Sequence, residues 1–541
     1  MAPQHLNGLG ILDNGQWKDV EKNDWSSVTT STPSSISPVS ESPSWKSPLS
    51  WRPASATARP AKHYLCRLRS LLWGRSASRH PPEKLRRTAY LDGLRGFAAF
   101  LVYCQHHELW AHSSDHGGES TNPIFELGFG YDGKYAFCAL PGIRTFFTGG
   151  HFAVAIFFAI SGYVLTAKPL ALLHAGDLGR MSDNLASALF RRWLRLYIPL
   201  MVTTFVYMLM WHLFFDGGRT IYAAQPQSNL RDEIWNWYAE FKNFSFIFTR
   251  GGEPWFSYNF HTWSIPVEMK GSIIVYTAVL SFSRMRTNAR LFCTLVLMWY
   301  FMYVADGWYG CVFLCGVLIG DLEHLSAQGR LPWPLHQLAP YCGTVFWWHA
   351  FAVGIYLGGV PSRTIDVLEL RRNRGWYYLS YLKPQATFDY KWFYLFWAAM
   401  FTMAAVPRLP VLRRFFETRF CQYLGRVSYA LYLVHGPVLW ILGDRLYTAA
   451  GWHTAWHRAR LVNWVDRWTW LLPHKGPLGL EPSFLALQVV LLPVTFGLAE
   501  LVTRWVDDPA VRLAAWLYAK MLPRPGEEQG NEKLSLEARK Q

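Results

Sequence analysis

Long apolar stretches separated by charged or aromatic loops recur along the chain from residue 94 onwards. A helix needs roughly 20 predominantly apolar residues to cross the hydrocarbon core of a bilayer. By this rule we expect about ten membrane spans. Their limits are 94–112, 147–167, 194–215, 259–281, 290–305, 307–323, 339–358, 391–407, 424–443 and 484–505. The pattern therefore predicts an all-α integral membrane protein built as a helical bundle.

Composition favours the same class. The chain has 541 residues, of which 51% are hydrophobic and 17% charged, whereas an average soluble domain is about 25% charged. Its 28 Trp residues also suit a membrane protein, because Trp and Tyr gather at membrane–water interfaces. The net charge of +16 does not indicate a nucleic-acid partner, since the arginines lie beside apolar stretches.

The chain divides into three predicted regions. Residues 1–85 are predicted to form a disordered cytosolic tail, because their first 60 residues are rich in Ser, Pro and Thr and lack an apolar run. Residues 88–515 hold the predicted spans, and residues 516–541 form a polar C-terminal tail. The eight cysteines show neither metal-ligand spacing nor a disulfide framework, so we predict no metal site.

Arginine clusters predict the orientation, because Lys and Arg are concentrated in cytosolic loops. They place both chain ends in the cytosol and put the long loops 113–146, 216–258, 359–390 and 444–483 on the opposite side. The sequon Asn243-Phe244-Ser245 falls in one of these loops, so Asn243 is a predicted glycosylation site. We expect the protein in the endoplasmic reticulum or another endomembrane.

Two ionisable residues within the first predicted span are candidates for function, since charged groups are costly inside a membrane. Arg95 and His106 are eleven residues apart, which is almost three helical turns, so they share a face about 16 Å apart along the axis. An extended pantetheine arm has a comparable length. Arg95 would hold an anionic headgroup while His106 meets the reactive end. The alternative is a snorkelling arginine and a histidine satisfied by a neighbouring helix.

Two further groups combine ionisable residues with apolar spans. Glu268 lies within a span and needs a partner there, and His261 is seven residues before it, roughly on the same face. Glu268 is thus a candidate to orient or charge-stabilise a catalytic histidine, or else a member of a structural ion pair. The second group consists of three arginines that precede another span on the predicted cytosolic side. It suits phosphate, which guanidinium groups bind bidentately, and it also acts as a topology signal. Its members are Arg191, Arg192 and Arg195.

Polar residues also recur at turn spacing near the end of the chain. Ser428 and His435, with Tyr432 between them, are a candidate nucleophile pair. No Gly-x-Ser-x-Gly elbow is present, however. We favour polar contacts between helices or the lining of a cavity, and His261 is a further candidate for that lining. In the helix predicted near residues 151–168, Ala155, Ser161 and Gly162 are small enough to predict close helix packing.

Five motifs in order resemble the acyltransferase-3 family of polytopic membrane acyltransferases. They are Leu91 to Gly96 with Arg95 followed by His106, the stretch Phe157 to Val164, Arg191-Arg192-x-x-Arg195-x-x-x-Pro199, Trp263 to Glu268, and Gly425-x-x-Ser428-Tyr429-x-x-Tyr432-x-x-His435. Two departures from the family pattern are Pro266 and Met269. The usual closing Glu-Arg-Pro is approximated by Glu500, Arg504 and Asp508-Pro509.

The resemblance implies an enzyme that moves an acyl group, commonly acetyl, from cytosolic acyl-CoA to a hydroxyl. It implies that Arg95 and His106 are essential, that the arginine cluster recognises the donor, and that His106 acts as general base or transient acyl carrier. The donor is a co-substrate, and no bound cofactor is expected. We expect a small-molecule acceptor such as a terpenoid or polyketide, with a cell-wall glycan, sterol or lipid as alternative.

Two other classes remain open. A transporter would use the same ionisable residues as a proton relay, although no inverted repeat is visible. A scaffold or receptor would make them structural.

Overall fold

The computed structural model describes residues 85–112, 127–133, 135–214, 227–248, 255–476 and 481–522. The chain divides into two units, residues 1–82 and 83–541, and all of the described residues belong to the second. The predicted N-terminal tail, apart from residue 85, and residues 523–541 of the predicted C-terminal tail lie outside the described residues.

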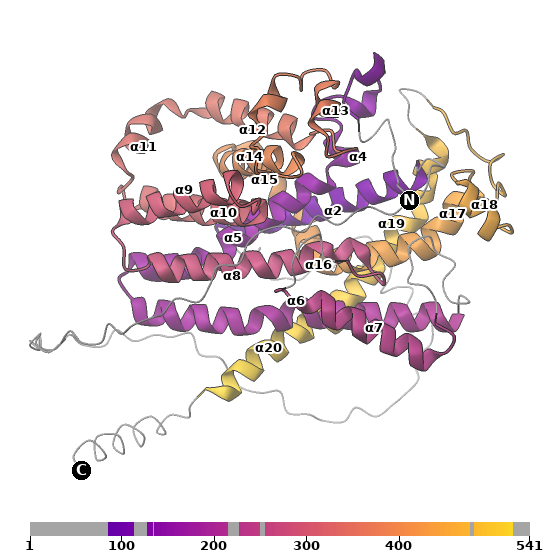
Figure 1. The fold of residues 1–541 in the computed structure, drawn as a ribbon, viewed down its shortest axis with the longest axis horizontal. Helices are drawn as coiled ribbons and strands as arrows, with labels where there is room; N and C mark the ends of the chain where they lie inside the picture. Colours follow the sequence, from indigo (N-terminus) through magenta and orange to yellow (C-terminus); the bar gives the residue numbers. More distant parts are fainter. Residues whose placement is uncertain are drawn as a thin grey trace, which may run out of the picture. The chain divides into compact units, whose positions relative to one another are not determined.

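Helices make up the fold, and the described residues contain no strand. A helix lies over each of the ten predicted spans, and most of these helices run side by side in Figure 1. They are α2 (Ala89–Ala111), α5 (Gly150–His174), α6 (Leu178–Phe214), α8 (Ser264–Phe282), α9 (Thr287–Tyr303), α10 (Trp308–Ala327), α12 (Thr344–Gly358), α14 (Lys391–Ala405), α16 (Arg419–Val438) and α19 (Pro482–Val502).

Further helices connect or flank these ten. They are α4 (Thr145–Thr148), α7 (Leu230–Ser245), α11 (Trp333–Leu338), α13 (Val367–Arg371), α15 (Pro410–Phe416), α17 (Asp444–Ala449), α18 (Ala455–Arg460) and α20 (Asp508–Met521). Two irregular turns matter for the site. The 3₁₀ turn η3 (Phe260–Trp263) leads into α8, and the π-helical turn η9 (Thr503–Asp507) joins α19 to α20.

The all-helical membrane architecture is confirmed, but the count of ten spans is not. Among the described residues, five helical stretches are long and apolar enough to cross a membrane: α5, α6, η3 with α8, α10, and the run from α19 to α20. A sixth is added if α14 and α15, which are bent by 97° at their junction, form one span. Helix α9 has 17 residues and α12 has 15, fewer than a crossing usually needs. Helix α2 contains Asp92, Arg95 and Glu108, which lower its apolar character.

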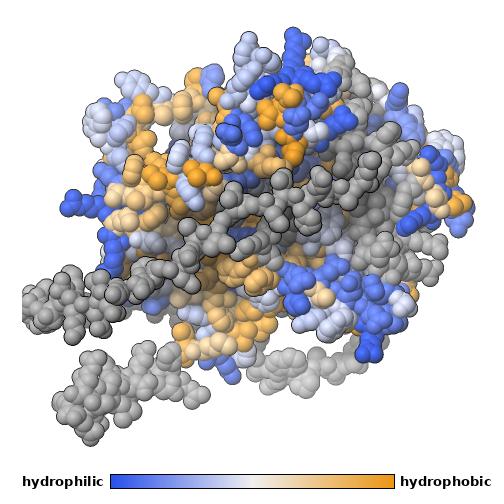
Figure 2. Space-filling view, viewed as in Figure 1, coloured by the Kyte–Doolittle hydropathy of each residue, from blue (hydrophilic) through white to orange (hydrophobic). Residues whose placement is uncertain are grey.

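Large apolar side chains lie at the surface of the bundle. Phe292 is 66% exposed, Val345 is 70% exposed and Val489 is 75% exposed. Figure 2 shows many hydrophobic residues exposed on one face, with the strongly hydrophilic residues gathered toward its margins. Such extensive apolar exposure is unusual for a soluble monomer and is expected where helices face lipid.

Small residues bring the central helices together. A Cβ atom on Gly162 of α5 would lie 1.9 Å from the carbonyl oxygen of Phe313 on α10, and one on Gly316 would lie 2.0 Å from the carbonyl oxygen of Ala159. The predicted packing role of Gly162 is therefore confirmed. Close backbone approach through small residues is how membrane helices pack without a hydrophobic driving force between them.

Glycines produce the same close approach between α2 and α16. A Cβ atom on Gly96 would lie 2.1 Å from the amide nitrogen of Gly425, and one on Gly425 would lie 2.4 Å from the carbonyl oxygen of Asp92. Residues 91–96 of α2 (the LDGLRG segment) and residues 425–429 of α16 (the GRVSY segment) therefore meet backbone to backbone. This contact sets Arg95 against Ser428, where the candidate site begins.

Candidate active site

A cavity of about 340 Å³ opens among six helices. It is bounded by residues of α2, α5, α6, α8, α16 and the η9–α20 junction. We call it the arginine cavity, and its lining residues are Arg95, Phe157, Phe158, Ser161, Arg192, Arg195, Leu196, Ser264, Ile265, Glu268, Arg426, Ser428, Tyr429, Tyr432, Asp507, Asp508 and Val511.

The guanidinium groups of the cavity have different partners. Arg95 donates from Nε to Ser428 Oγ at 3.1 Å and from Nη2 to the Gly425 carbonyl oxygen at 2.9 Å. Arg192 donates to Ser272 Oγ at 2.8 Å and forms an ion pair with Glu268. Arg426 pairs with Glu500. Arg195 is exposed and lines the cavity, so it presents a guanidinium fork that suits a phosphate.

The structure separates the three arginines of the predicted cluster. Arg192 and Arg195 line the cavity, but Arg191 does not. Arg191 Nε donates to the carbonyl oxygen of Ser187, one turn earlier on α6, at 3.0 Å. Its place on the helix therefore matches the alternative interpretation, in which this positive residue is a topology signal beside a predicted span.

Glu268 contacts an arginine rather than a histidine. Its carboxylate accepts hydrogen bonds from Ser161 and Arg192, and both side chains of the ion pair are largely buried. Among the described residues Glu268 forms no hydrogen bond with a histidine, and His261 lies in the 3₁₀ turn η3 that precedes α8. The geometry corresponds to the structural ion pair that the sequence left open.

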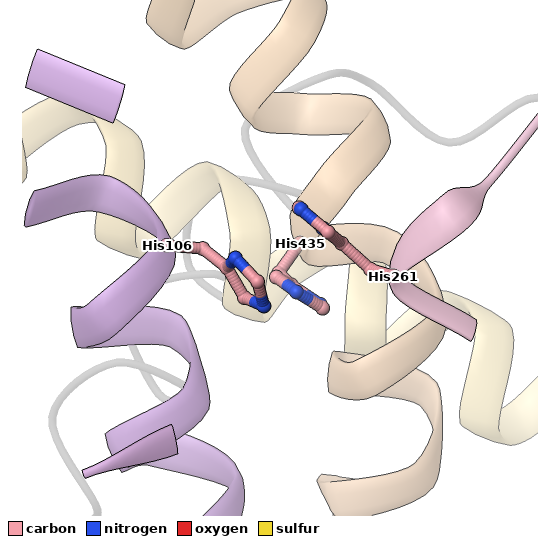
Figure 3. A group of neighbouring side chains, drawn as sticks. All are labelled: His106, His261 and His435. Carbon is pink, nitrogen blue, oxygen red and sulfur yellow. The ribbon is translucent and has the colours of Figure 1, made fainter. Parts of the chain in front are cut away.

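Three histidines from three elements form a separate group, which we call the histidine cluster (Figure 3). His106 is on α2, His261 is in η3 and His435 is on α16. The ring centroids of His106 and His261 are 3.7 Å apart, and those of His261 and His435 are 4.9 Å apart. His261 and His435 are 4% and 1% exposed. A nitrogen of each buried ring, Nδ1 of His261 and Nε2 of His435, has no hydrogen-bond partner.

The arrangement of the three rings is a stack. One nitrogen from each ring lies within 4.8 Å of the others, a spacing that invites comparison with a metal site. A metal ion lies in the plane of each imidazole that binds it, however, and the rings of His261 and His435 are inclined by only 8° and those of His106 and His261 by 25°. Nearly parallel planes do not converge on one ion, so this cluster suits proton exchange better than metal binding.

Two hydroxyl residues join the arginine cavity to the histidine cluster. Tyr432 and Ser264 both line the cavity, and their side-chain oxygens are 2.7 Å apart. The Tyr432 hydroxyl also donates to the carbonyl oxygen of His261, and its ring lies 5.8 Å from that of His435. The inner wall of the cavity is therefore in direct contact with the histidines.

The late helix α16 contributes contacts of the kind that the sequence favoured. Ser428 receives a hydrogen bond from Arg95 and donates one to the Gly425 carbonyl oxygen at 2.9 Å, so it makes the predicted polar contact between helices. Tyr432 lines the cavity, and His435 belongs to the histidine cluster.

Sequence reasoning missed several lining residues. Arg426 lies within the GRVSY segment and had a weak signal, because it is the cation next to Gly425. Tyr429 was named only as part of the last motif, and Asp507 had no usable signal, since it reaches the site only because η9 packs against α6 and α16. The remaining predicted site residue, Asn243, is exposed in the last turn of α7, away from both groups.

Comparisons with known proteins identify the family. The family model described as an acyltransferase domain, that of acyltransferase-3, matches residues 88–473. The chain is 29% identical over 492 residues to the O-acetyltransferase PaAT-1 of Phomopsis amygdali, covering 84% of this chain and 89% of that protein. It is 22% identical to the acyltransferase clz18 of Cochliobolus lunatus, over 81% of this chain and 97% of that protein.

A third relative is the acyltransferase R4 of a Phoma species, which is 23% identical over 68% of this chain and 86% of that protein. No solved structure matches the chain. The matched residues include the lining residues of the arginine cavity from Arg95 to Tyr432 and all three histidines of the histidine cluster. The chain is thus a membrane acyltransferase that belongs to the acyltransferase-3 family.

Proposed function

We propose that this enzyme transfers an acyl group, most simply acetyl, from acyl-CoA to a hydroxyl of a small molecule. One observation supports this most directly: a cavity with four arginines is joined through Tyr432 and Ser264 to a buried group of three histidines. An anionic donor with a long uncharged arm needs sites of these two kinds, one for its phosphates and one for its thioester.

The donor is proposed to bind with its phosphates at the arginine cavity. Arg195 and Arg95 offer guanidinium hydrogens there, and Arg426 lines the same space. Charge-assisted, bidentate hydrogen bonds make arginine suited to phosphate. Arg192 pairs with Glu268 and Arg426 pairs with Glu500, which fixes two parts of the wall, so Arg95 and Arg195 are the cations proposed to meet the donor. We propose that this end faces the cytosol, with both chain ends on that side.

The transfer step is proposed to occur at His106. A ring nitrogen of His106 takes the proton of the acceptor hydroxyl while the oxygen forms a bond to the thioester carbonyl carbon. The carbon–sulfur bond then breaks, and the leaving thiolate takes the proton from His106, which gives an ester and free CoA. In the alternative route, His106 itself attacks the thioester and carries the acyl group before the acceptor takes it.

Stacking gives the other two histidines a positioning role. His261 covers one face of the His106 ring at 3.7 Å between centroids, and His435 lies 5.1 Å from it. No carboxylate takes part in the cluster among the described residues. A neutral environment of this kind favours an uncharged imidazole, which is the form that accepts a proton.

The acceptor is proposed to be a hydroxylated secondary metabolite such as a terpenoid or polyketide. The named O-acetyltransferase activity of the Phomopsis amygdali relative supports acetyl as the group moved. We further propose residence in the endoplasmic reticulum or another endomembrane, with the exposed Asn243 glycosylated.

The experiment uses membranes from cells that express the wild type or His106→Ala. Labelled acetyl-CoA and an extract of hydroxylated metabolites are supplied to both. A labelled ester made only by the wild type supports the proposal and begins to identify the acceptor. Equal ester formation by both proteins would remove His106 from the mechanism. Export of an unmodified metabolite that depends on His106, without any ester, would indicate a transporter.

A further inference from the structure

A second group of metal-ligand side chains lies near the opposite end of α2 from Arg95. We call Glu108, His112 and Glu481 the outer cluster. Each residue offers one ligand atom, and these atoms lie within 4.8 Å of one another. Glu108 is two positions after His106, which turns it by about 200° around the helix. The outer cluster is therefore on the other side of α2 from the histidine cluster.

The hydrogen bonds of His112 define which nitrogen faces the cluster. Its Nδ1 atom lies 2.8 Å from the carbonyl oxygen of Glu108. A carbonyl only accepts hydrogen bonds, so Nδ1 carries the hydrogen. In a neutral ring Nε2 then holds a lone pair, and Nε2 lies 2.6 Å from a carboxylate oxygen of Glu481. Two acceptors at this distance require a proton between them, and a metal ion could take the place of that proton only if the two atoms moved apart.

The same hydrogen bond is typical of histidines that bind metals. A metal-binding imidazole usually donates its other N–H to a carbonyl or carboxylate, which fixes the tautomer and the ring orientation. The His112 ring is further fixed between aromatic neighbours, with its centroid 4.7 Å from Trp452 and 5.6 Å from Phe484. The ligand nitrogen is thus preoriented.

The carboxylate of Glu108 is the observation that favours a metal ion over a proton. Glu108 is 8% exposed, and its Oε2 atom accepts no hydrogen bond. Its ion-pair partner among the described residues is Nδ1 of His112 at 3.5 Å, whose hydrogen is directed to the backbone. In the part of the chain that the structure describes, no lysine or arginine pairs with Glu108 or Glu481.

The charge of the outer cluster bears on which cation it would hold. A single proton on His112 would compensate only one of the two carboxylates, so the other would need a proton of its own or stay charged, and a buried charge is costly. A divalent ion would neutralise both. Carboxylate and imidazole together are donors that Zn²⁺ accepts, at about 2.0–2.2 Å. In a tetrahedral site this separates two ligand atoms by about 3.4 Å, and Glu481, whose side chain is 26% exposed, has room to withdraw.

We propose that Glu108, His112 and Glu481 bind one Zn²⁺ ion, with water completing the coordination. The ion would tie the end of α2 to the start of α19, since Glu481 immediately precedes that helix. Two turns further along α19, Gln488 is hydrogen-bonded to Tyr103 of α2 at 2.8 Å and to Tyr447 at 2.7 Å. The metal would therefore complete a seam of polar contacts behind the segment that carries His106.

The test measures metal bound to the full-length enzyme, purified in detergent and equilibrated with Zn²⁺ before excess ion is removed. Elemental analysis is expected to find one Zn²⁺ per wild-type chain and its loss in His112→Ala and Glu108→Gln. His106→Ala and His435→Ala are the matched controls and are expected to retain the ion. Metal content is read independently of acyl transfer, so failure of the proposed activity would not affect this result.

A second measurement needs no variant. Chelation of the wild type is expected to lower its melting temperature, and Zn²⁺ is expected to restore it because an ion that binds only the folded state stabilises it. A wild type that holds no Zn²⁺ and melts unchanged with chelator would overturn the proposal and leave a protonated His112 as the bridge. Loss of the ion in His106→Ala with retention in His112→Ala would assign it to the histidine cluster instead.

Discussion

Arg95 Nε donates a 3.1 Å hydrogen bond to Ser428 Oγ, although 333 residues separate the two positions in the sequence. The contact exists because Gly96 and Gly425 let α2 and α16 touch at the backbone. A second bond from the same guanidinium reaches the Gly425 carbonyl oxygen. Arg95 is thus fixed in direction by α16 while it lines the cavity proposed for the donor phosphates.

This geometry predicts that lysine cannot replace Arg95. Arg95→Lys keeps the charge but loses the planar fork that bonds to α16 and phosphate together. We expect KM for acyl-CoA to rise about tenfold, which corresponds to about 1.4 kcal/mol, with a larger rise in Arg95→Ala. Arg191→Lys is the matched control, because Arg191 does not line the cavity. Initial rates at varied acyl-CoA measure both, and equal effects at the two positions would remove Arg95 from donor binding.

The close approach of α2 and α16 predicts a loss of stability when either glycine gains a methyl group. In Gly425→Ala the new Cβ would lie 2.4 Å from the Asp92 carbonyl oxygen, so the helices must separate. Overpacking of this kind costs about 1–3 kcal/mol. Gly497→Ala on α19 is the control, since a Cβ there meets nothing within 4 Å. Melting curves in detergent compare them, and an unchanged melting temperature for Gly425→Ala would contradict the packing.

Local sequence patterns predicted the helices well and the contacts between them less well. Apolar length located each of the ten helices, because hydrophobicity and helical period are properties of neighbouring residues. The same pattern counted ten spans where five or six meet the length and apolar requirement. The excess arises where helices such as α2 carry polar site residues, and where α9 and α12 are short.

The candidate site shows the same division. The motif order indicated that Arg95, Arg192 and Arg195 serve one site, and all three line the cavity, whereas the partner of Glu268 is Arg192 and not the histidine considered from the sequence. Asp507 was beyond reach of the sequence, since it joins the site through packing of η9 against α6 and α16. Long-range contacts of this type leave no periodic signal in one chain.

Glu268 supports a prediction that separates its two interpretations. As a buried partner of Arg192, it should be needed for stability, because removing one charge of a buried pair costs about 3–5 kcal/mol. We therefore expect Glu268→Gln to melt at a lower temperature and to bind acyl-CoA more weakly, with the pH profile of kcat unchanged. A shifted pH profile without a loss of stability would show that Glu268 acts on a histidine after all.

The junction between the cavity and the histidine cluster gives the last prediction. The Tyr432 hydroxyl donates to the carbonyl oxygen of His261 and so holds η3, which carries the ring stacked on His106. Tyr432→Phe keeps the ring and removes this bond together with the contact to Ser264 Oγ, which would let His261 shift. Because small misplacements of reacting groups cost up to about 100-fold in rate, we expect kcat to fall about 10- to 100-fold with little change in KM for acyl-CoA.

Tyr429→Phe is the matched control for this change. Tyr429 lines the same cavity from the same helix, but its hydroxyl donates to the Leu196 carbonyl oxygen on α6, away from the histidines. Its loss should affect kcat little. Steady-state rates for both variants decide the matter, since a rate loss that follows Tyr432 alone requires its hydroxyl to act through the bonds to His261 and Ser264. Equal losses in the two variants would mean that the cavity wall, and not the position of His261, limits the transfer.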